Sequence, residues 1–570
     1  MRRLFIVLCV WCWSLGAAAQ FASSDEGLKR LIVLCYHDVR EEAPKGGSDY
    51  VMEVAELVNQ FSWLKENGYT AVTLQQVLAA RDGKAPLPAK PVLLTFDDGY
   101  RSFYTHVYPL LRLFRYPAVL AVVGSWVDNP KDSATNAPAD APLLGWDEIR
   151  VLAKSGLVDI ASHSYDLHHD VQGNPQGNAF AAATARRFDA KSGSYEDDAN
   201  YEQRIRADLA RSVDAIQRNT GVRPRAMVWP YGSYNLTARR IARELGMDIS
   251  LGLDDHVPTS RPFGLHLGRV LMVGNPSTRE FVAEMLRPYK ADPVRAVRVN
   301  LDDVFDADPA IREQKLSRLV DRVAALGINT VYLSAASDTD GDGRVDQAYF
   351  PSALMPMRAD LFARTSWQLH TRTRVKVFAW LPLRDIQWPV APTTAAARAQ
   401  DRESLLHQEL ARYAPFDGLL FDDRIADGDA DYRAAMHEVE RAVALYRSVP
   451  RIARAISPAS LRQPAEGSGR GGAIAALADE VDQLVVRVPD RRVPADPGMR
   501  ALAAGIAAHP PGRAAMVFEL SGRDPGLVDS LRALQLNGVA DLSYDPDDFL
   551  RNAPALERVR TVMSLQSQPR

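Results

Sequence analysis

The chain has 570 residues, more than one ordinary domain contains, so the sequence predicts two domains. Its formal net charge is −3 at pH 7. A nucleic-acid partner is not expected on electrostatic grounds, because phosphate backbones are bound by strongly basic surfaces.

Residues 1–19 have the pattern of a secretory signal peptide. Arg2 and Arg3 precede an apolar stretch from Leu4 to Leu15, and Ala17-Ala18-Ala19 follows as a cleavage site of the A-x-A type. The apolar stretch is too short to span a bilayer, and no second one follows it. We therefore expect an exported chain that is not anchored by a transmembrane helix.

The cysteines support this reading. Cys9 and Cys12 lie inside the apolar stretch, so a lipoprotein anchor is not expected. Export leaves Cys35 as the only cysteine of the mature chain, which excludes an intrachain disulfide. Cys35 lies in an apolar run, and we expect it to be a buried strand residue without a reactive role.

Strand-like and helix-like segments alternate in the first half of the chain. Leu57, Phe61 and Leu64 fall at helical spacing, and Gly68 follows as a stop signal. Four apolar runs predict buried strands, at Leu31 to Tyr36, Val92 to Phe96, Ala118 to Val123 and Val158 to Ser162.

A long insertion and a linker complete this first domain. The segment from Asp170 to Asn200 is rich in Gly, Asn, Ala, Ser and Asp, so we expect a surface insertion there. Pro288 and Pro293 mark the linker. The predicted domains are therefore residues 26–288 and residues 294–570.

The second half repeats a strand-then-helix unit eight times, which predicts a (β/α)8 barrel. Its clearest helix places Leu316, Leu319 and Leu326 on one face and ends before Gly327. The strand candidates are Ala296–Leu301, Thr330–Ala335, Val375–Leu381, Gly418–Phe421, Arg451–Ile456, Gln483–Val488, Ala514–Phe518 and Val539–Tyr544. Acidic pairs end the first and fourth of them, namely Asp302 with Asp303 and Asp422 with Asp423.

Two clusters in the first half predict a divalent-metal site. Asp97 and Asp98 end the strand that begins at Val92, and His163 and His168 follow the strand that ends at Ser162. Asp98 and the two imidazoles supply three metal ligands and leave positions open for water, while Asp97 remains as a base. Either cluster alone is more often a turn or a loop. Together, at the ends of strands, they favour metal-assisted hydrolysis.

Other strand ends supply the remaining groups for such a reaction. His37 ends the first predicted strand and is the candidate acid for a leaving amine. The block Trp229-Pro230-Tyr231-Gly232 could form a wall of the site and offer a backbone N–H to an oxyanion. We therefore expect Trp229 and Tyr231 to contact the substrate.

These motifs resemble the polysaccharide deacetylase family (NodB homology, carbohydrate esterase family 4). The resemblance is greatest to its two-domain members, which act on poly-β-1,6-N-acetyl-D-glucosamine in biofilm export. It covers nearly the whole mature chain and implies an α/β first domain folded as a distorted (β/α)7-type barrel. It also implies Asp97 as base, Asp98, His163 and His168 as metal ligands, and an acid histidine placed before the first motif, as His37 is.

The second half resembles the glycoside hydrolase domain of the same proteins, with departures at its site. The first strand ends Leu301-Asp302-Asp303 where the family has Leu-Asp-Tyr, and Arg424 follows Asp423 where the family ends His-Asp-Asp. Glycoside cleavage needs an acid. Asp423 is the candidate, with Asp302 and Asp303 as partner or sugar-binding residues. Because Arg424 favours the charged form of Asp423, cleavage and simple binding both stay open.

The resemblance implies a periplasmic N-deacetylase of poly-N-acetylglucosamine that could pass its product to an outer-membrane exporter. Its cofactor would be zinc, nickel, cobalt or iron, since this ligand set accepts each of them. One alternative is a deacetylase of chitin oligomers or peptidoglycan. A further alternative, for the second half alone, is a non-catalytic carbohydrate-binding module.

Overall fold

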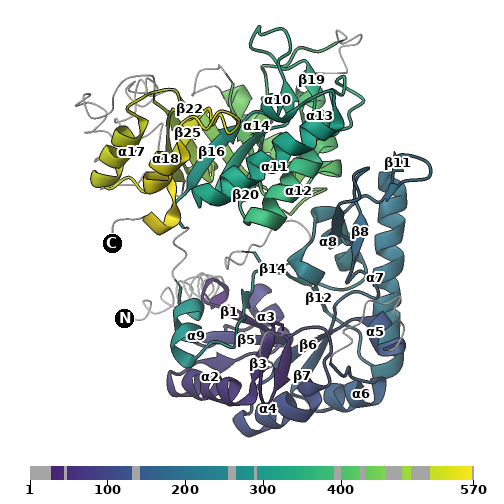
Figure 1. The fold of residues 1–570 in the computed structure, drawn as a ribbon. Helices are drawn as coiled ribbons and strands as arrows, with labels where there is room; N and C mark the ends of the chain where they lie inside the picture. Colours follow the sequence, from purple (N-terminus) through teal and green to yellow (C-terminus); the bar gives the residue numbers. More distant parts are fainter. Residues whose placement is uncertain are drawn as a thin grey trace, which may run out of the picture. The chain divides into compact units, whose positions relative to one another are not determined.

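The chain folds into two compact units in this computed structural model (Figure 1). The structure describes residues 27–43, 48–130, 141–254, 265–287, 292–389, 399–423, 430–448, 450–456, 478–488 and 514–567. The first unit comprises Met1–Val171 and Ala179–Lys290, and the second comprises Gln172–Asn178 and Ala291–Arg570. The predicted signal peptide and Pro288 lie outside the described residues.

A nine-stranded parallel sheet forms the centre of the first unit, in the order β14-β13-β12-β7-β6-β5-β1-β15 with β4 beside β5. The strands are β1 (Ile32–Tyr36), β4 (Thr70–Ala71), β5 (Pro91–Phe96), β6 (Ala118–Val122), β7 (Val158–Ser162), β12 (Ala226–Val228), β13 (Ile249–Leu251), β14 (Leu265–Leu267) and β15 (Val270–Leu271). The four predicted strands are confirmed. The prediction of an α/β domain folded as a distorted barrel is also confirmed, with the parallel sheet left open between its end strands β14 and β15.

Both faces of this sheet are buried, which explains the continuous apolar runs. Leu94 and Leu120 pack into one hydrophobic cluster, while their neighbours Leu93 and Val119 pack into the other. The helices are α2 (Val54–Glu66), α3 (Leu74–Arg81), α4 (Tyr108–Phe114), α5 (Gly124–Asp128), α6 (Trp146–Lys154), α7 (Asp198–Thr220), α8 (Leu236–Glu244) and α9 (Thr278–Met285), with a π-helix at Phe103–Val107 and a 3-10 turn at Pro230–Gly232.

The predicted helix around Phe61 is α2, which buries Leu57, Phe61 and Leu64. The chain leaves this helix through Asn67, and Gly68 has a left-handed φ of 75°. Glycine adopts that conformation without the steric cost that a Cβ would add. The predicted stop signal is therefore confirmed.

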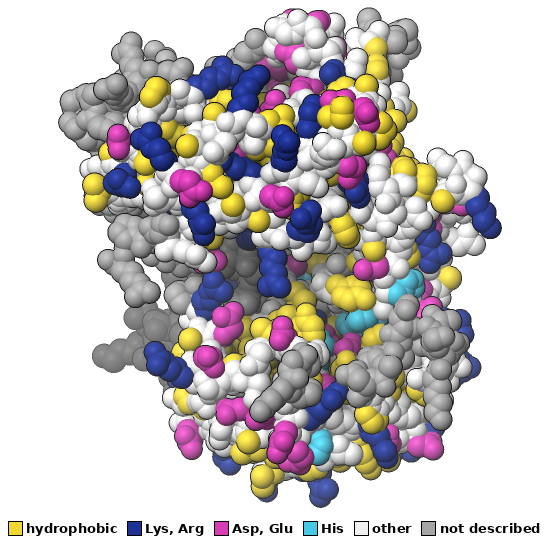
Figure 2. Space-filling view, in the orientation of Figure 1, with side chains coloured by type: hydrophobic (Ala, Val, Ile, Leu, Met, Phe, Trp, Pro, Cys, Tyr) yellow, Lys and Arg dark blue, Asp and Glu magenta, His cyan; other side chains and the backbone are white. Residues whose placement is uncertain are grey.

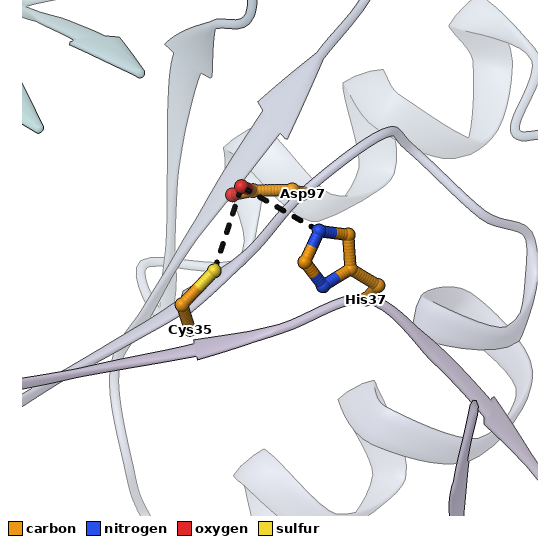
Figure 3. Close-up of side chains that lie close together, drawn as sticks. All are labelled: Cys35, His37 and Asp97. Carbon is orange, nitrogen blue, oxygen red and sulfur yellow. Dashed lines mark hydrogen bonds and ion pairs between the residues drawn. The ribbon is translucent and has the colours of Figure 1, made fainter. Parts of the chain in front are cut away.

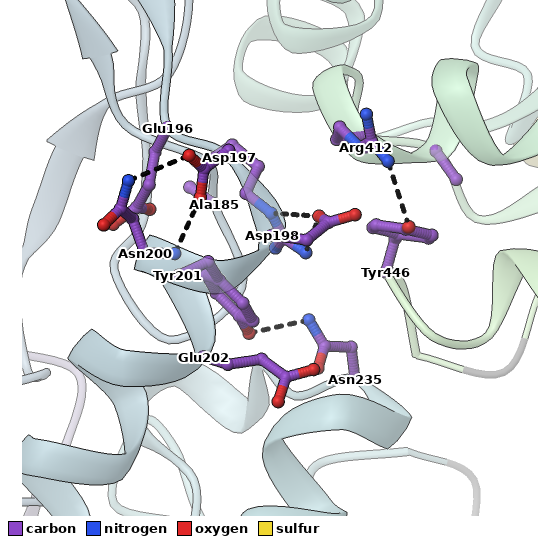
Figure 4. A network of polar contacts seen from close by, with 12 residues as sticks. Ala185, Glu196, Asp197, Asp198, Asn200, Tyr201, Glu202, Asn235, Arg412 and Tyr446 are labelled. Carbon is purple, nitrogen blue, oxygen red and sulfur yellow. Dashed lines mark hydrogen bonds and ion pairs between the residues drawn. The ribbon is translucent and has the colours of Figure 1, made fainter.

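The predicted surface insertion contains more regular structure than its composition suggested. It holds two small antiparallel pairs, and α7 already starts at Asp198 because the Asp197 side chain accepts the backbone N–H of Asn200 at 2.7 Å (Figure 4). The hydroxyl of Tyr201 then accepts a hydrogen bond from Asn235, the residue that caps α8. The pairs are β8 (Asp170–Gln172) with β9 (Ala179–Ala181) and β10 (Phe188–Asp189) with β11 (Ser194–Tyr195). A further parallel pair joins β2 (Asp38–Arg40) to β3 (Val51–Glu53).

The second unit is a closed eight-stranded parallel barrel, as predicted. Its strands are β16 (Arg295–Val299), β17 (Thr330–Ser334), β20 (Lys376–Trp380), β21 (Gly418–Phe421), β22 (Arg451–Ile456), β23 (Gln483–Arg487), β24 (Ala515–Ser521) and β25 (Leu542–Asp545). Closure is made by β16, which pairs with both β17 and β25. Tyr332, Phe378 and Val485 belong to one buried cluster of strand residues, and a larger cluster joins the strands to the helices.

Among the described residues of the second unit, helices follow the strands. They are α10 (Leu301–Val304), α11 (Pro309–Leu326), α12 (Phe362–Thr373), α13 (Ala399–Tyr413), α14 (Ala430–Val443), α17 (Leu527–Leu536) and α18 (Leu556–Met563), with a short 3-10 turn at Leu565–Ser567 and a hairpin of β18 (Ala336–Ser337) with β19 (Gln347–Ala348). The predicted helix with Leu316 is α11, which ends at Gly327 with a left-handed φ of 64°. Within the described residues, no helix combines the length and the apolar character needed to cross a bilayer.

We predict that Gly418→Ala destabilises the barrel. Gly418 lies on β21 between Phe378 and Arg451, and a Cβ there would approach the Phe378 ring to 2.4 Å and the Arg451 carbonyl oxygen to 2.6 Å. Overpacking of this kind costs about 1–3 kcal/mol. Thermal unfolding of the whole chain measures it, with Gly145→Ala as the control because nothing lies within 4 Å of a Cβ there. Equal unfolding temperatures for the two variants would contradict the prediction.

Candidate active site

Two adjacent carboxylates follow β5 and face different partners. Asp97 and Asp98 are both buried, with exposed fractions of 3% and 6%. The backbone N–H of Asp97 still bonds the carbonyl oxygen of Tyr36 on β1, but Asp98 has a left-handed φ of 72°. That conformation costs free energy in a residue other than glycine and is often found at functional sites. The turn at Asp98 sends the second carboxylate away from the first.

Asp98 meets the two predicted imidazole ligands. Its Oδ1 lies 3.3 Å from Nε2 of His163 and 3.3 Å from Nε2 of His168. The same Oδ1 is buried and has no hydrogen-bond partner. Metal–ligand bonds of about 2.0–2.2 Å place neighbouring ligand atoms roughly 3.0–3.5 Å apart. The three side chains therefore fit a divalent ion, which would also satisfy the unpartnered oxygen.

His163 is held in the orientation that a metal ligand requires. Its Nδ1 lies 2.8 Å from the carbonyl oxygen of Val228 on β12, so Nδ1 carries the proton and Nε2 is the ligand atom. Burial opposes the charged form of His163, but Asp97 and Asp98 raise its pKa above the ordinary value. Burial likewise opposes ionisation of Asp98, and the two imidazoles hold the pKa of Asp98 well below its usual range.

Asp208 on α7 fixes the loop between the two imidazoles, a role that the sequence did not reveal. Its carboxylate accepts the backbone N–H of Tyr165 at 2.9 Å and of Asp166 at 2.8 Å. Burial raises the pKa of Asp208 to about 6, against the opposing effect of these two hydrogen bonds. The carboxylate satisfies backbone donors that the metal-binding loop exposes, which keeps His168 near Asp98.

Asp97 belongs to a second cluster, together with Cys35 and His37 (Figure 3). Nη1 of Arg269 donates to both of its oxygens, at 2.8 and 2.9 Å. Oδ2 of Asp97 also lies 4.0 Å from Nε2 of His37 and 3.5 Å from Sγ of Cys35. Burial opposes ionisation of Asp97, but Arg269, His163 and His37 together lower its pKa. The carboxylate is therefore charged and able to accept a proton.

Arg269 was not predicted as a site residue. It follows β13 and β14, which are too short to show a strand pattern in the sequence. Only the parallel pairing of β15 with β1 brings it to Asp97.

His37 faces Asp97 from the end of β1. Burial lowers the pKa of His37, against the opposing pull of Asp98 and Asp97. Its ring lies 5.0 Å from that of Tyr50, and its Nδ1 has no hydrogen-bond partner. The predicted acid is thus within reach of the predicted base. Cys35 is completely buried, as expected for a strand residue, and burial raises the pKa of its thiol.

The two clusters share one cavity of about 630 Å³. Its walls include Tyr50, Trp126, Tyr231 and Leu253. Figure 2 shows histidine side chains beside hydrophobic ones on the surface of this unit. A cavity of this size that combines aromatic and apolar walls with convergent titratable groups is typical of a ligand site.

Within the block Trp229-Pro230-Tyr231-Gly232, the two aromatic side chains have different surroundings. Tyr231 is 51% exposed, has a left-handed φ of 57°, and places its ring 4.6 Å from that of His168. The side chain of Trp229, in contrast, is fully buried, and its Nε1 donates to Ser250. The side chain of Trp229 is covered by protein in this structure, but Trp229 is among the residues that line the cavity, so its contact with substrate stays a prediction. The buried ring of Trp229 supports the wall that Tyr231 forms.

A hydrogen-bonded group lies beneath this wall. The carboxylate of Asp254 lies 2.5 Å from Nε2 of His266 and accepts the hydroxyl of Tyr234 at 2.6 Å. The structure thus gives Asp254 a supporting place near the cavity, with Tyr234 and His266 as partners.

In the barrel, the first acidic pair lies just beyond β16. Asp302 and Asp303 form part of the single-turn helix α10, after Asn300 caps it. Asp302 accepts hydrogen bonds from Ser337 at 2.7 Å and from Tyr349 at 2.5 Å, while Asp303 is exposed. Asp303 is therefore available to a ligand.

The two carboxylates of the second acidic pair, Asp422 and Asp423, already have partners within the barrel. Asp422 forms ion pairs with Arg298 and Arg487, and Arg298 also pairs with Glu519. Asp423 accepts four hydrogen bonds, from the backbone N–H groups of Leu383, Arg384 and Asp385 and from the hydroxyl of Tyr432. These contacts differ from those expected of a proton donor, and Arg424 lies outside the described residues.

Comparison with known proteins gives two matches to family models. The polysaccharide deacetylase family matches residues 84–250, and a hypothetical glycosyl hydrolase family 13 matches residues 298–462. Among solved structures, the deacetylase domain of BpsB from Bordetella bronchiseptica is 40% identical, covering 42% of this chain and 95% of that one at a TM-score of 0.37. The PgaB (BpsB) glycoside hydrolase domain from the same organism is 27% identical, covering 48% and 99% at a TM-score of 0.41.

A curated relative aligns over nearly its whole length. It is the poly-β-1,6-N-acetyl-D-glucosamine N-deacetylase of Escherichia coli strain K12, 30% identical over 95% of this chain and 92% of that protein. The resemblance seen in the motifs is therefore confirmed across both units. The chain belongs to the PgaB-type family of polysaccharide deacetylases, in which a deacetylase domain is followed by a glycosyl hydrolase-like domain.

Proposed function

We propose that the protein hydrolyses N-acetyl groups of poly-β-1,6-N-acetyl-D-glucosamine in a metal-dependent reaction. The observation that supports this most is that one cavity holds both Asp98 with its two imidazoles and the pair of Asp97 with His37. The Escherichia coli relative is named for that activity. Amide hydrolysis needs carbonyl polarisation, a base for water and an acid for the amine, and these residues supply each requirement.

A divalent ion held by Asp98, His163 and His168 would act as a Lewis acid toward the acetyl carbonyl. Asp97 accepts the proton of the attacking water, since the Arg269 guanidinium keeps it ionised. His37, 4.0 Å from Asp97, delivers a proton to the leaving amine. Proton removal and proton delivery thus belong to two different side chains of one cluster.

The wall formed by Tyr231 supplies groups for the acetyl oxygen and the sugar. Tyr231 lines the cavity, and its backbone N–H is the candidate donor to a developing oxyanion. Its exposed ring faces the cavity and offers an apolar surface to a pyranose. Zinc, nickel, cobalt and iron all suit the three ligands.

The location and partners are part of the same proposal. The signal-peptide pattern of residues 1–19 supports export to the periplasm, where the polymer would be met on its way to an outer-membrane exporter. The deacetylase domain would span residues 26–288 and the barrel residues 294–570. A deacetylase of chitin oligomers or peptidoglycan is the rival, and rates on defined oligomers of each linkage distinguish the two.

The barrel has a second candidate function, because it matches a glycosyl hydrolase-like family. We propose that it binds the partly deacetylated polymer. Free amines make that product cationic, and Asp303 is exposed beyond β16 with Asp302 beside it. Cleavage would need a proton donor, and the four hydrogen bonds on Asp423 make that residue a poor one.

Metal removal tests the main proposal. Chelator-treated protein should release no acetate from β-1,6-linked N-acetylglucosamine oligomers, and nickel, cobalt, zinc or iron should restore release, since the carbonyl is otherwise not polarised. His163→Ala should stay inactive with every metal. Full activity in the metal-free protein, or in His163→Ala, would refute the assignment.

Arg269→Met should move the acidic limb of the pH profile upward. Burial opposes ionisation of Asp97, and Arg269 contributes most among the neighbours that lower its pKa, so that pKa should rise when Arg269 is lost. The base is then protonated at a higher pH, and kcat/KM falls earlier on acidification. The profile is compared with that of Arg225→Met, a change at the surface. If the acidic limbs of the two variants coincide, Arg269 does not control the pKa of Asp97.

The barrel proposal predicts salt-sensitive binding of the cationic product. Partly deacetylated polymer should bind more tightly than fully acetylated polymer, and the difference should shrink at high salt. Asp303→Asn should weaken this binding, while Asp321→Asn, at an exposed position on α11, should not. The length of the polymer after incubation decides between binding and cleavage. If the protein shortens the polymer and Asp423→Asn does not, the barrel is a hydrolase.

A further inference from the structure

Three different metal-binding side chains meet beside the site already described. Strands β1 and β5 run parallel with Cys35 opposite Thr95, so the residues just after the strands also come together. Oδ2 of Asp97 lies 3.5 Å from Sγ of Cys35 and 4.0 Å from Nε2 of His37 (Figure 3). All three ligand atoms lie within 4.8 Å of one another.

The spacing and the donor types fit a small tetrahedral ion. Zn–S bonds of about 2.3 Å and Zn–N or Zn–O bonds of about 2.0–2.2 Å place ligand atoms roughly 3.3–3.7 Å apart. The observed separations need only small side-chain movements to reach this range. A thiolate among the donors selects thiophilic ions, which distinguishes this set from the Asp98 set with its nitrogen and oxygen donors.

We propose that Cys35, His37 and Asp97 form a second metal site, which binds a thiophilic divalent ion such as Zn²⁺ and inhibits the enzyme. Binding replaces the proton of the Cys35 thiol, which leaves to solvent as the sulfur–metal bond forms. The oxidation states of sulfur and metal do not change. None of the three residues belongs to the first ligand set, so both sites can be occupied in one chain.

The surroundings make this the weaker site. Arg269 already neutralises Asp97 and its positive charge disfavours a nearby cation. Cys35 is completely buried, whereas His37 lines the cavity, so an ion would enter from the His37 side. We expect the second site to fill only after the first. Excess zinc would then inhibit an enzyme that a single equivalent of metal activates.

The proposed inhibition of acetate release rests on the proposed function. Occupancy of the second metal site does not. An ion on Nε2 of His37 and a carboxylate oxygen of Asp97 would remove both the acid and the base. The thiolate–metal bond itself can be observed without any substrate, so the two ideas fail separately.

The test uses the full chain with Cys9 and Cys12 replaced by serine, which leaves Cys35 as its one thiol. Protein loaded with one equivalent of nickel is titrated with Cd²⁺, followed by thiolate-to-cadmium absorption in the near ultraviolet and by counting bound ions. We expect the absorption band and a second bound ion. Both should be lost in Cys35→Ser and kept in Ser125→Ala, a change at another buried polar side chain.

Zinc inhibition of acetate release is then measured relative to the uninhibited rate of each protein. The inhibitory concentration should rise on the order of tenfold or more in Cys35→Ser, since even the loss of a supporting contact costs about 10–100-fold in metal affinity. The absence of a thiolate band in the parent protein would overturn the site, even if the serine variant fails to fold. If the band is present but zinc inhibition does not depend on Cys35, the inhibitory role is overturned. A band in a chain that releases no acetate with any metal would leave the site standing and refute the deacetylase.

Discussion

The backbone turn after β5 is the constraint on which the site depends. Two carboxylates next to each other in sequence would repel if they shared one environment, and one of them would take up a proton. The left-handed conformation of Asp98 directs its carboxylate to His163 and His168, while Asp97 stays with Arg269. Each buried charge therefore has its own opposite charge or ligand partners, and both can stay ionised.

The parallel sheet brings the remaining groups to that turn. The carboxyl ends of parallel strands meet at one edge, where open α/β sheets usually bind their ligands. His37 follows β1, His163 follows β7, and Tyr231 follows β12, so strands far apart in sequence deliver their side chains to one cavity. Less visible contacts hold them in place: Val228 orients His163, and Asp208 ties the metal-binding loop to α7.

Strands that are buried on both faces could be predicted from the sequence, and side-chain partners could not. Gly418–Phe421 and Arg451–Ile456 form with the predicted bounds because parallel strands in a barrel are continuously apolar. β12 to β15 contain two or three residues each, too few for a pattern, so Arg269 was missed. Residue type also did not show that Trp229 is covered by protein, or that the hydrogen bonds of Asp423 are already filled.

The central claim is that two neighbouring carboxylates have separate roles. It is tested most directly by measuring nickel stoichiometry by titration calorimetry, together with acetate release, in Asp97→Asn and Asp98→Asn. Asp97→Asn should bind one equivalent of nickel yet release almost no acetate, because the base is gone while the ligands remain. Asp98→Asn should lose both binding and release. If Asp97→Asn also fails to bind nickel, or if Asp98→Asn binds it as the parent does, the division of roles is wrong.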